Sequence, residues 1–394
     1  MKGDPLPVNP MLQVSLEDFP TARSVTYLNS ASISLMPRPA LDRMIEFERM
    51  IASGGTIGFD EEAETQALEG ARNEAAHLLN ARGDEIAVLS SASQGLCSLA
   101  WSLNLKAGSN VVSTDADFPS VVYPWMRLAQ EKGLEVRLAQ NRDGVVSEAD
   151  LEKLVDDHTA VISISHVEYG TGQRFDLRWL AELAHSHGAL LVVDATQSAG
   201  LVPIDLSREG VDALVAGGYK GLLGPFGAAI LYLREELIGK LTPSLVGWRS
   251  TPIPYDMDAR TLPFAEGAKK FEFSTMSYSS TFGLAESMKY LRGLGHGNVS
   301  SHVLALTAEL IQMIKSSCKL PETVILTPED ERSHASIASF RFKGRDQSAV
   351  AAALVKQNVI VSQRFNGIRF SFHVYNKEED LHRAVQVLEE FLAK

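Results

Sequence analysis

The segment VDALVAGGYKGLLGPFGAAILYL, residues Val211–Leu233, contains two apolar runs that are typical of buried strands, with a loop between them. The loop carries one lysine, Lys220, among a tyrosine and several glycines. Glycine has no Cβ, so a loop that is rich in glycine can bend sharply and bring its backbone close to another group. A cation in this place, rather than on a solvated helix face, indicates that the loop holds something bound.

Short β-rich runs alternate with helical patterns on both sides of this segment. The predicted strands are Glu85–Ser90, Asn110–Thr114, Leu134–Leu138, Ala160–Ser165, Ala189–Asp194, Ala213–Ala216 and Gly227–Leu233. The predicted helices between them are Gly95–Leu103, Val121–Lys132, Glu148–Val155 and Leu177–His187, the last with Asp176 as N-cap and Gly188 just past its end. This order predicts a large α/β domain with a mostly parallel seven-stranded sheet between helices.

The remainder of the chain has a different pattern. Residues Pro243–Lys270 have no clear period and predict a long irregular connection. From Phe282 onward we predict a long helix, strands near Ser336–Phe342 and Ile368–His373, and a final amphipathic helix, Lys377–Ala393. We therefore expect a large domain over residues 22–270. A smaller α+β C-terminal domain is expected to combine residues 271–394 with the N-terminal segment 1–21.

Composition narrows the class of function. The chain has 394 residues, of which 45% are hydrophobic and 22% charged, as in ordinary globular proteins. Its formal charge of −12 disfavours nucleic acid or an anionic membrane as the main partner. Neither a membrane span nor the apolar stretch of a secretory signal is evident, so we expect a cytoplasmic protein. Cys97 and Cys318 are too few for a disulfide framework or a four-cysteine metal site, and we expect both to be buried.

Polar residues follow the predicted strands at the points where the strands end. In a parallel sheet these ends share one edge, where ligands bind. The segment Ser91–Gly95 opens a helix whose free backbone N–H groups favour a phosphate. Asp117–Pro119, His166–Gly170, Asp194–Gln197 and Lys220 come after other strands of the same sheet. The sequence thus predicts a phosphate site, an aromatic residue, a carboxylate and a lysine at one edge.

Each of these features has a plainer interpretation when taken alone. Asp194 could be a turn residue or a ribose ligand, although neither a G-x-G-x-x-G nor a Walker motif is present. Phe118 could belong to the core. His185 and His187, near a predicted helix end, fit dipole partners better than metal ligands. Only the combination of these features at one edge of the sheet indicates a specific function.

The combination resembles the class V aminotransferase family of pyridoxal phosphate (PLP) enzymes, which includes cysteine desulfurases, kynureninases and isopenicillin-N-epimerase-like proteins. The resemblance rests on Asp194-Ala195-Thr196-Gln197, on Ala216-Gly217-Gly218-Tyr219-Lys220 and on Gly224-Pro225-Phe226-Gly227. It extends from Tyr27-Leu28-Asn29-Ser30-Ala31 to Arg369-Phe370-Ser371-Phe372-His373-Val374-Tyr375-Asn376. The resemblance implies PLP fold type I, with pyridoxal 5′-phosphate as the cofactor.

The resemblance also implies roles for individual residues. Lys220 would hold PLP as a Schiff base, for which a desolvated amine is suited. Asp194 would keep the pyridine nitrogen protonated, so that the ring accepts electrons released at the substrate Cα. Phe118 would stack on the ring, and Gln197 and Tyr169 would bond its oxygen. The phosphate would be bound by Ser91, Ala92, Ser93 and Tyr219.

The C-terminal half supplies further expected contacts. Thr275, in Phe271-Glu272-Phe273-Ser274-Thr275, resembles the family threonine that reaches the phosphate of the neighbouring subunit, which implies a homodimer with shared sites. Arg369 matches the arginine that binds the substrate carboxylate through a bidentate fork. Ser30 and Arg364 are weaker candidates for substrate contacts.

Departures from the family pattern narrow the reaction. Desulfurases carry a nucleophilic cysteine shortly before the carboxylate arginine, whereas Val361–Gly367 contains none. Phe118 and Tyr219 resemble instead the kynureninase and epimerase-like branches, which include lyases that cleave a Cβ–S bond. We therefore expect a lyase that acts on an α-amino acid with a leaving group at Cβ. The alternatives are an epimerase or aminotransferase of the same family, or a binding protein that keeps the fold without turnover.

Overall fold

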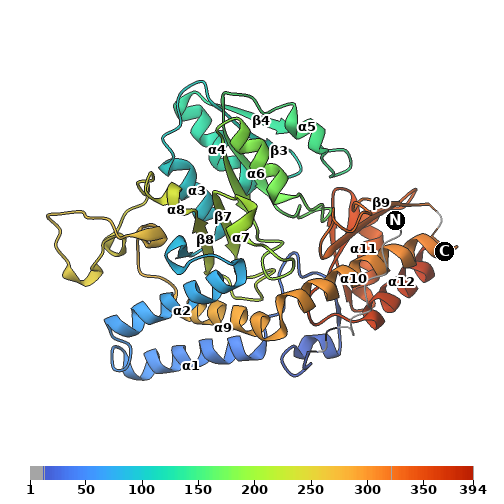
Figure 1. Ribbon diagram of the computed structural model, residues 1–394. Coiled ribbons are helices and arrows are strands. Elements are labelled where there is room, and N and C mark those ends of the chain that lie inside the picture. Colours follow the sequence, from blue (N-terminus) through green and yellow to red (C-terminus); the bar gives the residue numbers. More distant parts are fainter. Residues whose placement is uncertain (1–11, 13, 321, 394) are drawn as a thin grey trace.

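A seven-stranded sheet forms the centre of the computed structural model, which describes residues 12, 14–320 and 322–393 (Figure 1). Its strands follow the order β2-β8-β7-β6-β5-β3-β4, and only β8 runs antiparallel to its neighbours. Their bounds are β2 Ile86–Leu89, β3 Asn110–Thr114, β4 Glu135–Ala139, β5 Thr159–Ser165, β6 Leu190–Asp194, β7 Ala213–Gly217 and β8 Ala229–Leu233. The predicted mostly parallel sheet is confirmed.

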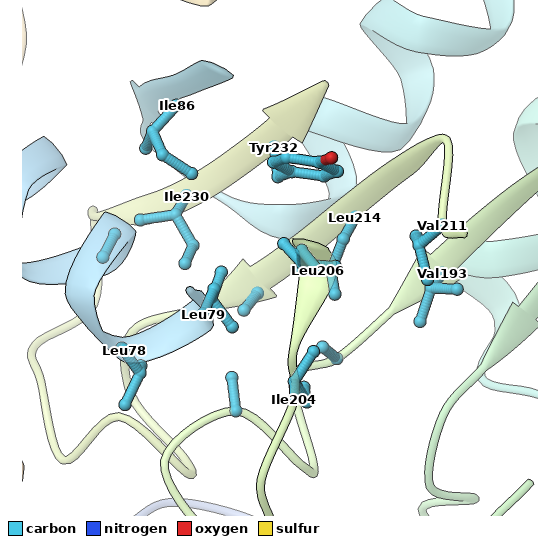
Figure 2. Close-up of a cluster of buried hydrophobic side chains, with 14 of the residues drawn as sticks. Leu78, Leu79, Ile86, Val193, Ile204, Leu206, Val211, Leu214, Ile230 and Tyr232 are labelled. Atoms are coloured by element: carbon cyan, nitrogen blue, oxygen red, sulfur yellow. The ribbon is translucent and has the colours of Figure 1, made fainter. Parts of the chain in front are cut away.

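Helices cover both faces of this sheet because its strands are apolar on both sides. The helices of this part are α1 Arg38–Gly54, α2 Glu61–Leu79, α3 Ala92–Ser102, α4 Pro119–Lys132, α5 Glu148–Glu152, α6 Leu177–Ser186, α7 Leu206–Glu209, α8 Glu235–Ile238 and α9 Tyr278–Leu294. Alternate strand residues pack against α2, α6, α7 and α9 on one face and against α3, α4 and α8 on the other. Figure 2 shows part of the first face, where Leu79 of α2 lies near Ile230 of β8; Leu78 and Tyr232 belong to the same buried cluster.

A smaller unit follows α9. Its elements are α10 His296–Ser316, β9 Thr323–Ile325, β10 Ile337–Phe342, α11 Gln347–Lys356, β11 Val359–Ile360, β12 Ser362–Arg364, β13 Gly367–Ser371 and α12 Glu378–Leu392. An antiparallel sheet in the order β12-β13-β10-β9 packs its apolar face against α10, α11 and α12. The short strand β1, Thr26–Tyr27, pairs in parallel with β11 and so joins the start of the chain to this unit. The predicted α+β C-terminal domain is present.

Several local predictions are confirmed and others are corrected. Asp176 caps α6 by accepting hydrogen bonds from the N–H groups of Arg178 and Trp179. The predicted single helix after Phe282 is two helices, because Gly295 adopts φ +83° and ends α9. The cysteines are exposed, not buried: Cys97 points away from the packed side of α3, and Cys318 follows the end of α10.

Other expectations remain untested. Residues 1–11 and 13 of the predicted small domain lie outside the described residues, and the domain limits at residues 22 and 270 remain predictions. The irregular connection predicted over Pro243–Lys270 is present: between α8 and α9 the chain forms only three short 3-10 helices, which are η3 Trp248–Ser250, η4 Pro254–Asp256 and η5 Gly267–Phe271. This connection projects from the body at the left of Figure 1. None of the described helices is both long and apolar enough to cross a membrane.

Close backbone packing behind the lysine loop predicts a stability difference between two glycine variants. A Cβ at Gly221 would lie 2.3 Å from the carbonyl oxygen of Ala199, whereas a Cβ at Gly239, where φ is −62°, would have no atom within 4 Å. Gly221→Ala should therefore lower the free energy of unfolding by about 1–3 kcal/mol, the usual cost of overpacking. Gly239→Ala should leave it unchanged or raise it slightly. Thermal unfolding of both variants measures this, and equal midpoints would contradict the packing argument.

Candidate active site

A pocket lies at the carboxyl ends of β5, β6 and β7, beside the N-termini of α3 and α4. It is lined by Ser91, Ala92, Ser93, Phe118, Ser120, Ser165, Val167, Tyr169, Asp194, Thr196, Gln197, Gly217, Tyr219 and Lys220. Nine of the ten residues expected to contact a cofactor are in this lining, all except Thr275. The other five lining residues were not predicted as contacts, because their residue types carry no distinctive pattern; they are Ser120, Ser165, Val167, Thr196 and Gly217.

Lys220 is the basic group of the pocket. Its loop follows β7, and its Nζ lies 5.4 Å from the ring centroids of both Phe118 and Tyr219. Burial lowers the pKa of Lys220 to about 8, with Asp194 acting in the opposite direction and Arg369 and Arg364 adding to the decrease. A neutral amine is therefore accessible near neutral pH, as a nucleophile or a proton acceptor requires.

Asp194 is the carboxylate that faces this amine. It ends β6, and the parallel pairing of β6 with β7 places it opposite Val215, close to where the lysine loop begins. Its Oδ1 accepts a hydrogen bond of 2.8 Å from the N–H of Thr196. Burial raises the pKa of Asp194, and the Lys220 charge and the Thr196 bond oppose that increase. The site thus holds a buried carboxyl group whose ionised form is stabilised by a neighbouring cation.

The start of α3 offers an anion-binding surface. Ser91 is its N-cap and accepts a hydrogen bond from the N–H of Gln94. Ser93 lies in the first turn, with its Oγ 2.7 Å from Oγ of Ser120 at the start of α4. Free N–H groups at a helix start, together with hydroxyl donors, suit a phosphate.

Phe118 and Gln197 also line the pocket, as the sequence predicted. Phe118 is 41% exposed, so the alternative of a core phenylalanine does not apply. Its ring meets that of Tyr169 at 5.5 Å between centroids and 81° between planes. The Gln197 amide donates to the carbonyl oxygen of Ala31, which fixes one end of this side chain.

Two buried carboxyl groups, Asp117 and Glu168, lie near Asp194; the sequence placed both at strand ends but indicated no role for them, because burial is not visible in the local pattern. Asp117 accepts hydrogen bonds from the Ser165 hydroxyl, at 2.5 Å, and from its N–H. Burial raises the pKa of Asp117 to about 7. Glu168 is fully buried, and burial, reinforced by Asp117, raises its pKa well above the ordinary value. Burial therefore disfavours the ionised form of both groups, whereas the Lys220 charge opposes this effect at Asp194.

Arg369 is a buried cation beside the pocket. Its Nη1 donates to the backbone oxygen of Tyr169 and its Nη2 to the hydroxyl of Ser32, both at 2.6 Å. Its Nε has no partner, and no carboxylate of the described residues forms an ion pair with it. Burial lowers its pKa to about 9. An unneutralised buried guanidinium is costly, so its environment suits an anionic ligand.

Three other predicted residues lie outside the pocket lining. The Ser30 hydroxyl donates to the backbone oxygen of Phe372. Arg364 is half-buried at the end of β12, and Thr275 is exposed on the irregular connection. The structure therefore does not bring Ser30, Arg364 or Thr275 into the wall formed by Lys220 and Asp194.

The residues present fit pyridoxal phosphate. The unpaired polar atoms supply the complementary charges: the lysine amine for the aldehyde, the start of α3 for the phosphate and Asp194 for the ring nitrogen. The unpartnered Nε of Arg369 is left for a substrate carboxylate. Among the described residues, Lys220, Asp194 and Arg369 form no ion pairs that would compete with the cofactor or substrate.

Comparison with known proteins gives a consistent picture. The model of the family Aminotransferase class-V matches residues 26–384. The uncharacterized aminotransferase YcbU of Bacillus subtilis is 31% identical over 367 residues, covering 93% of this chain and 94% of the relative. A probable cysteine desulfurase of Pyrococcus abyssi is 28% identical, covering 95% and 96%. The structure of an apo cysteine desulfurase from Thermococcus onnurineus NA1 superposes with a TM-score of 0.86 at 26% identity, covering 97% and 99%.

The lowered pKa of Lys220 predicts how cofactor binding depends on pH. The neutral amine predominates above a pKa of about 8, whereas an ordinary lysine stays charged up to about pH 10. The rate at which the cofactor-free protein binds pyridoxal phosphate should rise from about pH 7 to about pH 9 and then level off. The absorbance of the lysine-bound cofactor at about 420 nm, followed over time at each pH, measures this rate.

A variant extends this measurement. Because the Arg364 charge lowers the pKa of Lys220, Arg364→Gln should raise it and move the same curve to higher pH. A wild-type rate that keeps rising to about pH 10 would show that Lys220 has an ordinary pKa.

Proposed function

The chain belongs to the class V aminotransferase family and is a pyridoxal phosphate enzyme, and from this premise we propose that it is a lyase. It would cleave the bond between Cβ and a sulfur, or a similar leaving group, of an α-amino acid. The observation that carries this proposal is the pocket lining, which combines Lys220, Asp194 and aromatic rings and contains no cysteine. Without a thiol at the site, sulfur would leave with the product rather than pass to the protein.

Lys220 is the group that moves the proton in this proposal. With its pKa lowered to about 8, its amine accepts the proton from the substrate Cα. Bound pyridoxal phosphate supplies an electron sink that stabilises the resulting negative charge. The electron pair then forms the Cα–Cβ double bond while the Cβ–S pair leaves with sulfur. Hydrolysis of the remaining fragment gives pyruvate and ammonia.

The other pocket residues bind and orient in this proposal. Asp194 would keep the pyridine nitrogen of the cofactor protonated, because a carboxylate next to this nitrogen favours its charged form. Phe118 would cover one face of the ring, with Gln197 and Tyr169 at its oxygen. Ser91, Ala92, Ser93 and Tyr219 would hold the phosphate, and Arg369 would pair with the substrate carboxylate.

A homodimer is part of the same proposal. Thr275 would reach the phosphate site of the partner from the irregular connection, where it is exposed. The same connection exposes several large apolar side chains, which are Leu245, Val246, Ile253, Met257 and Leu262. Large exposed apolar groups gathered on one projection are typical of a surface that a second chain covers.

Removal of the lysine tests whether this pocket binds the cofactor. Lys220→Ala should abolish the absorbance band near about 420 nm and reduce turnover by about 10²–10⁴-fold or more, because both the attachment point and the base are lost. Lys240→Ala, at an exposed lysine outside the pocket, is the matched control and should change neither. An unchanged spectrum in Lys220→Ala would show that Lys220 is not the residue that binds the cofactor covalently.

The type of reaction is tested on a panel of amino acids. We expect pyruvate and ammonia from amino acids with a thioether or disulfide sulfur at Cβ, measured by coupled reduction of pyruvate. Amino-group transfer to an added keto acid without pyruvate would indicate an aminotransferase, and loss of optical activity alone would indicate an epimerase. Either result would overturn the lyase, and no spectral change with any amino acid would indicate a binding protein.

A further inference from the structure

Arg364 and Arg369 lie on the same face of one hairpin. In the antiparallel pairing of β12 with β13, Ser362 is opposite Arg369 and Arg364 is opposite Gly367. Since side chains alternate along a strand, both arginines project from one face as diagonal neighbours, with Cβ atoms about 7–8 Å apart. The intervening Ile368 projects into the apolar core of the small unit.

The hairpin turn holds this geometry firmly. Phe365 and Asn366 form a two-residue turn with φ of +46° and +55°, the conformation that tight hairpins require. The Phe365 ring packs against the pocket wall, 5.8 Å from the Tyr169 ring centroid. A Cβ on Gly170 would lie only 2.0 Å from this ring, so the wall fits it closely. The turn that follows Arg364 is therefore held against the loop that carries Tyr169.

The arginine face of the hairpin looks toward the pocket. On the other side of β13, Ser339 of β10 is opposite Arg369, and its hydroxyl donates to the backbone oxygen of Gly170. Arg369 itself donates to the backbone oxygen of Tyr169. Both bonds reach the same loop, which contributes Tyr169 to the pocket lining.

Charge balance distinguishes Arg364 from a structural arginine. Arg341, on the same face, is neutralised by Asp143 at 2.7 Å. In contrast, Arg364 donates through Nη1 to the backbone oxygen of Gln363 and forms no ion pair with any described residue. Its charge also reaches the site, because it lowers the pKa values of Lys220 and Arg369. One substrate carboxylate on Arg369 would leave this second cation unneutralised.

We propose that Arg364 binds a second anionic group, so that the substrate is an α-amino acid that carries a carboxylate beyond its Cβ leaving-group bond. The inference rests on the proposed function in placing the α-carboxylate at Arg369. Two carboxylates separated by a chain of several bonds match two guanidinium groups on diagonal positions of a hairpin.

An isosteric pair of thioethers tests the charge requirement. S-carboxymethyl-L-cysteine and S-carbamoylmethyl-L-cysteine share the Cβ–S bond and differ only in a carboxylate against an amide. The wild-type kcat/KM should favour the carboxylate by about tenfold or more, the scale of one charge-assisted interaction. Arg364→Gln should reduce this ratio to about one, and Arg364→Lys should retain part of it.

Controls separate a specific effect from a general one. Arg345→Gln removes an exposed arginine outside the hairpin and should leave the ratio unchanged. Thermal unfolding of Arg364→Gln checks that the hairpin is intact. Equal wild-type activity on both thioethers would overturn the inference while leaving the lyase in place. An equal loss on both thioethers in Arg364→Gln would also overturn it, since Arg364 would then serve the α-carboxylate or the pocket as a whole.

A binding measurement is independent of elimination. Calorimetry with L-glutamate and L-glutamine, which have no leaving group at Cβ, should show tighter binding of glutamate to the wild-type holoenzyme and no preference in Arg364→Gln. If neither thioether is cleaved but this preference holds, the lyase is wrong and the second anion site stands. If glutamate and glutamine bind equally to the wild type, the inference fails.

Discussion

The active site depends on the burial of the Lys220 amine at the carboxyl ends of the parallel strands. The backbone around Lys220 is held from several directions: Ser34 donates its hydroxyl to the Lys220 carbonyl, and the ring of His373 lies 3.1 Å from the Gly221 carbonyl. Gly221 itself packs against the backbone of Ala199. A buried lysine has a lowered pKa only while its surroundings stay closed, so these contacts maintain its chemistry.

The distribution of charge around this amine follows from the same burial. Burial raises the pKa values of Asp117, Glu168 and Asp194, and among these three the Lys220 charge opposes the increase at Asp194, the carboxyl group that complements this amine. The buried Arg369 and the half-buried Arg364 have no carboxylate partners among the described residues. Buried charges without partners are costly for folding and are typical of sites whose ligand completes them.

Much of the fold could be predicted because its signals are local. All seven central strands were predicted within about two residues, since each is a short apolar run bounded by turn residues. Helices α1 and α2 were missed. The many Ala and Glu residues of α2 give a weak apolar pattern, whereas α1 carries Ala40, Met44, Phe47 and Ile51 at helical spacing and could have been predicted. Packing against α9 stabilises both helices. The break at Gly295 was also missed, since a lone glycine is often tolerated inside a helical pattern. The exposure of both cysteines was missed because burial was expected from the residue type alone.

The sequence by itself determined the strand order along the chain, the glycine-rich loop of Lys220, the position of Asp194 at a strand end and the absence of cysteine from the segment before Arg369. Each of these is a property of neighbouring residues. Only the tertiary structure decided that the hairpin of Arg364 and Arg369 meets the Tyr169 loop, and that the segment with Ser32 and Ser34 is hydrogen-bonded to Arg369 and to the Lys220 backbone. These contacts join residues more than 150 positions apart, and such pairings arise from packing of whole faces, on which local periodicity carries no information.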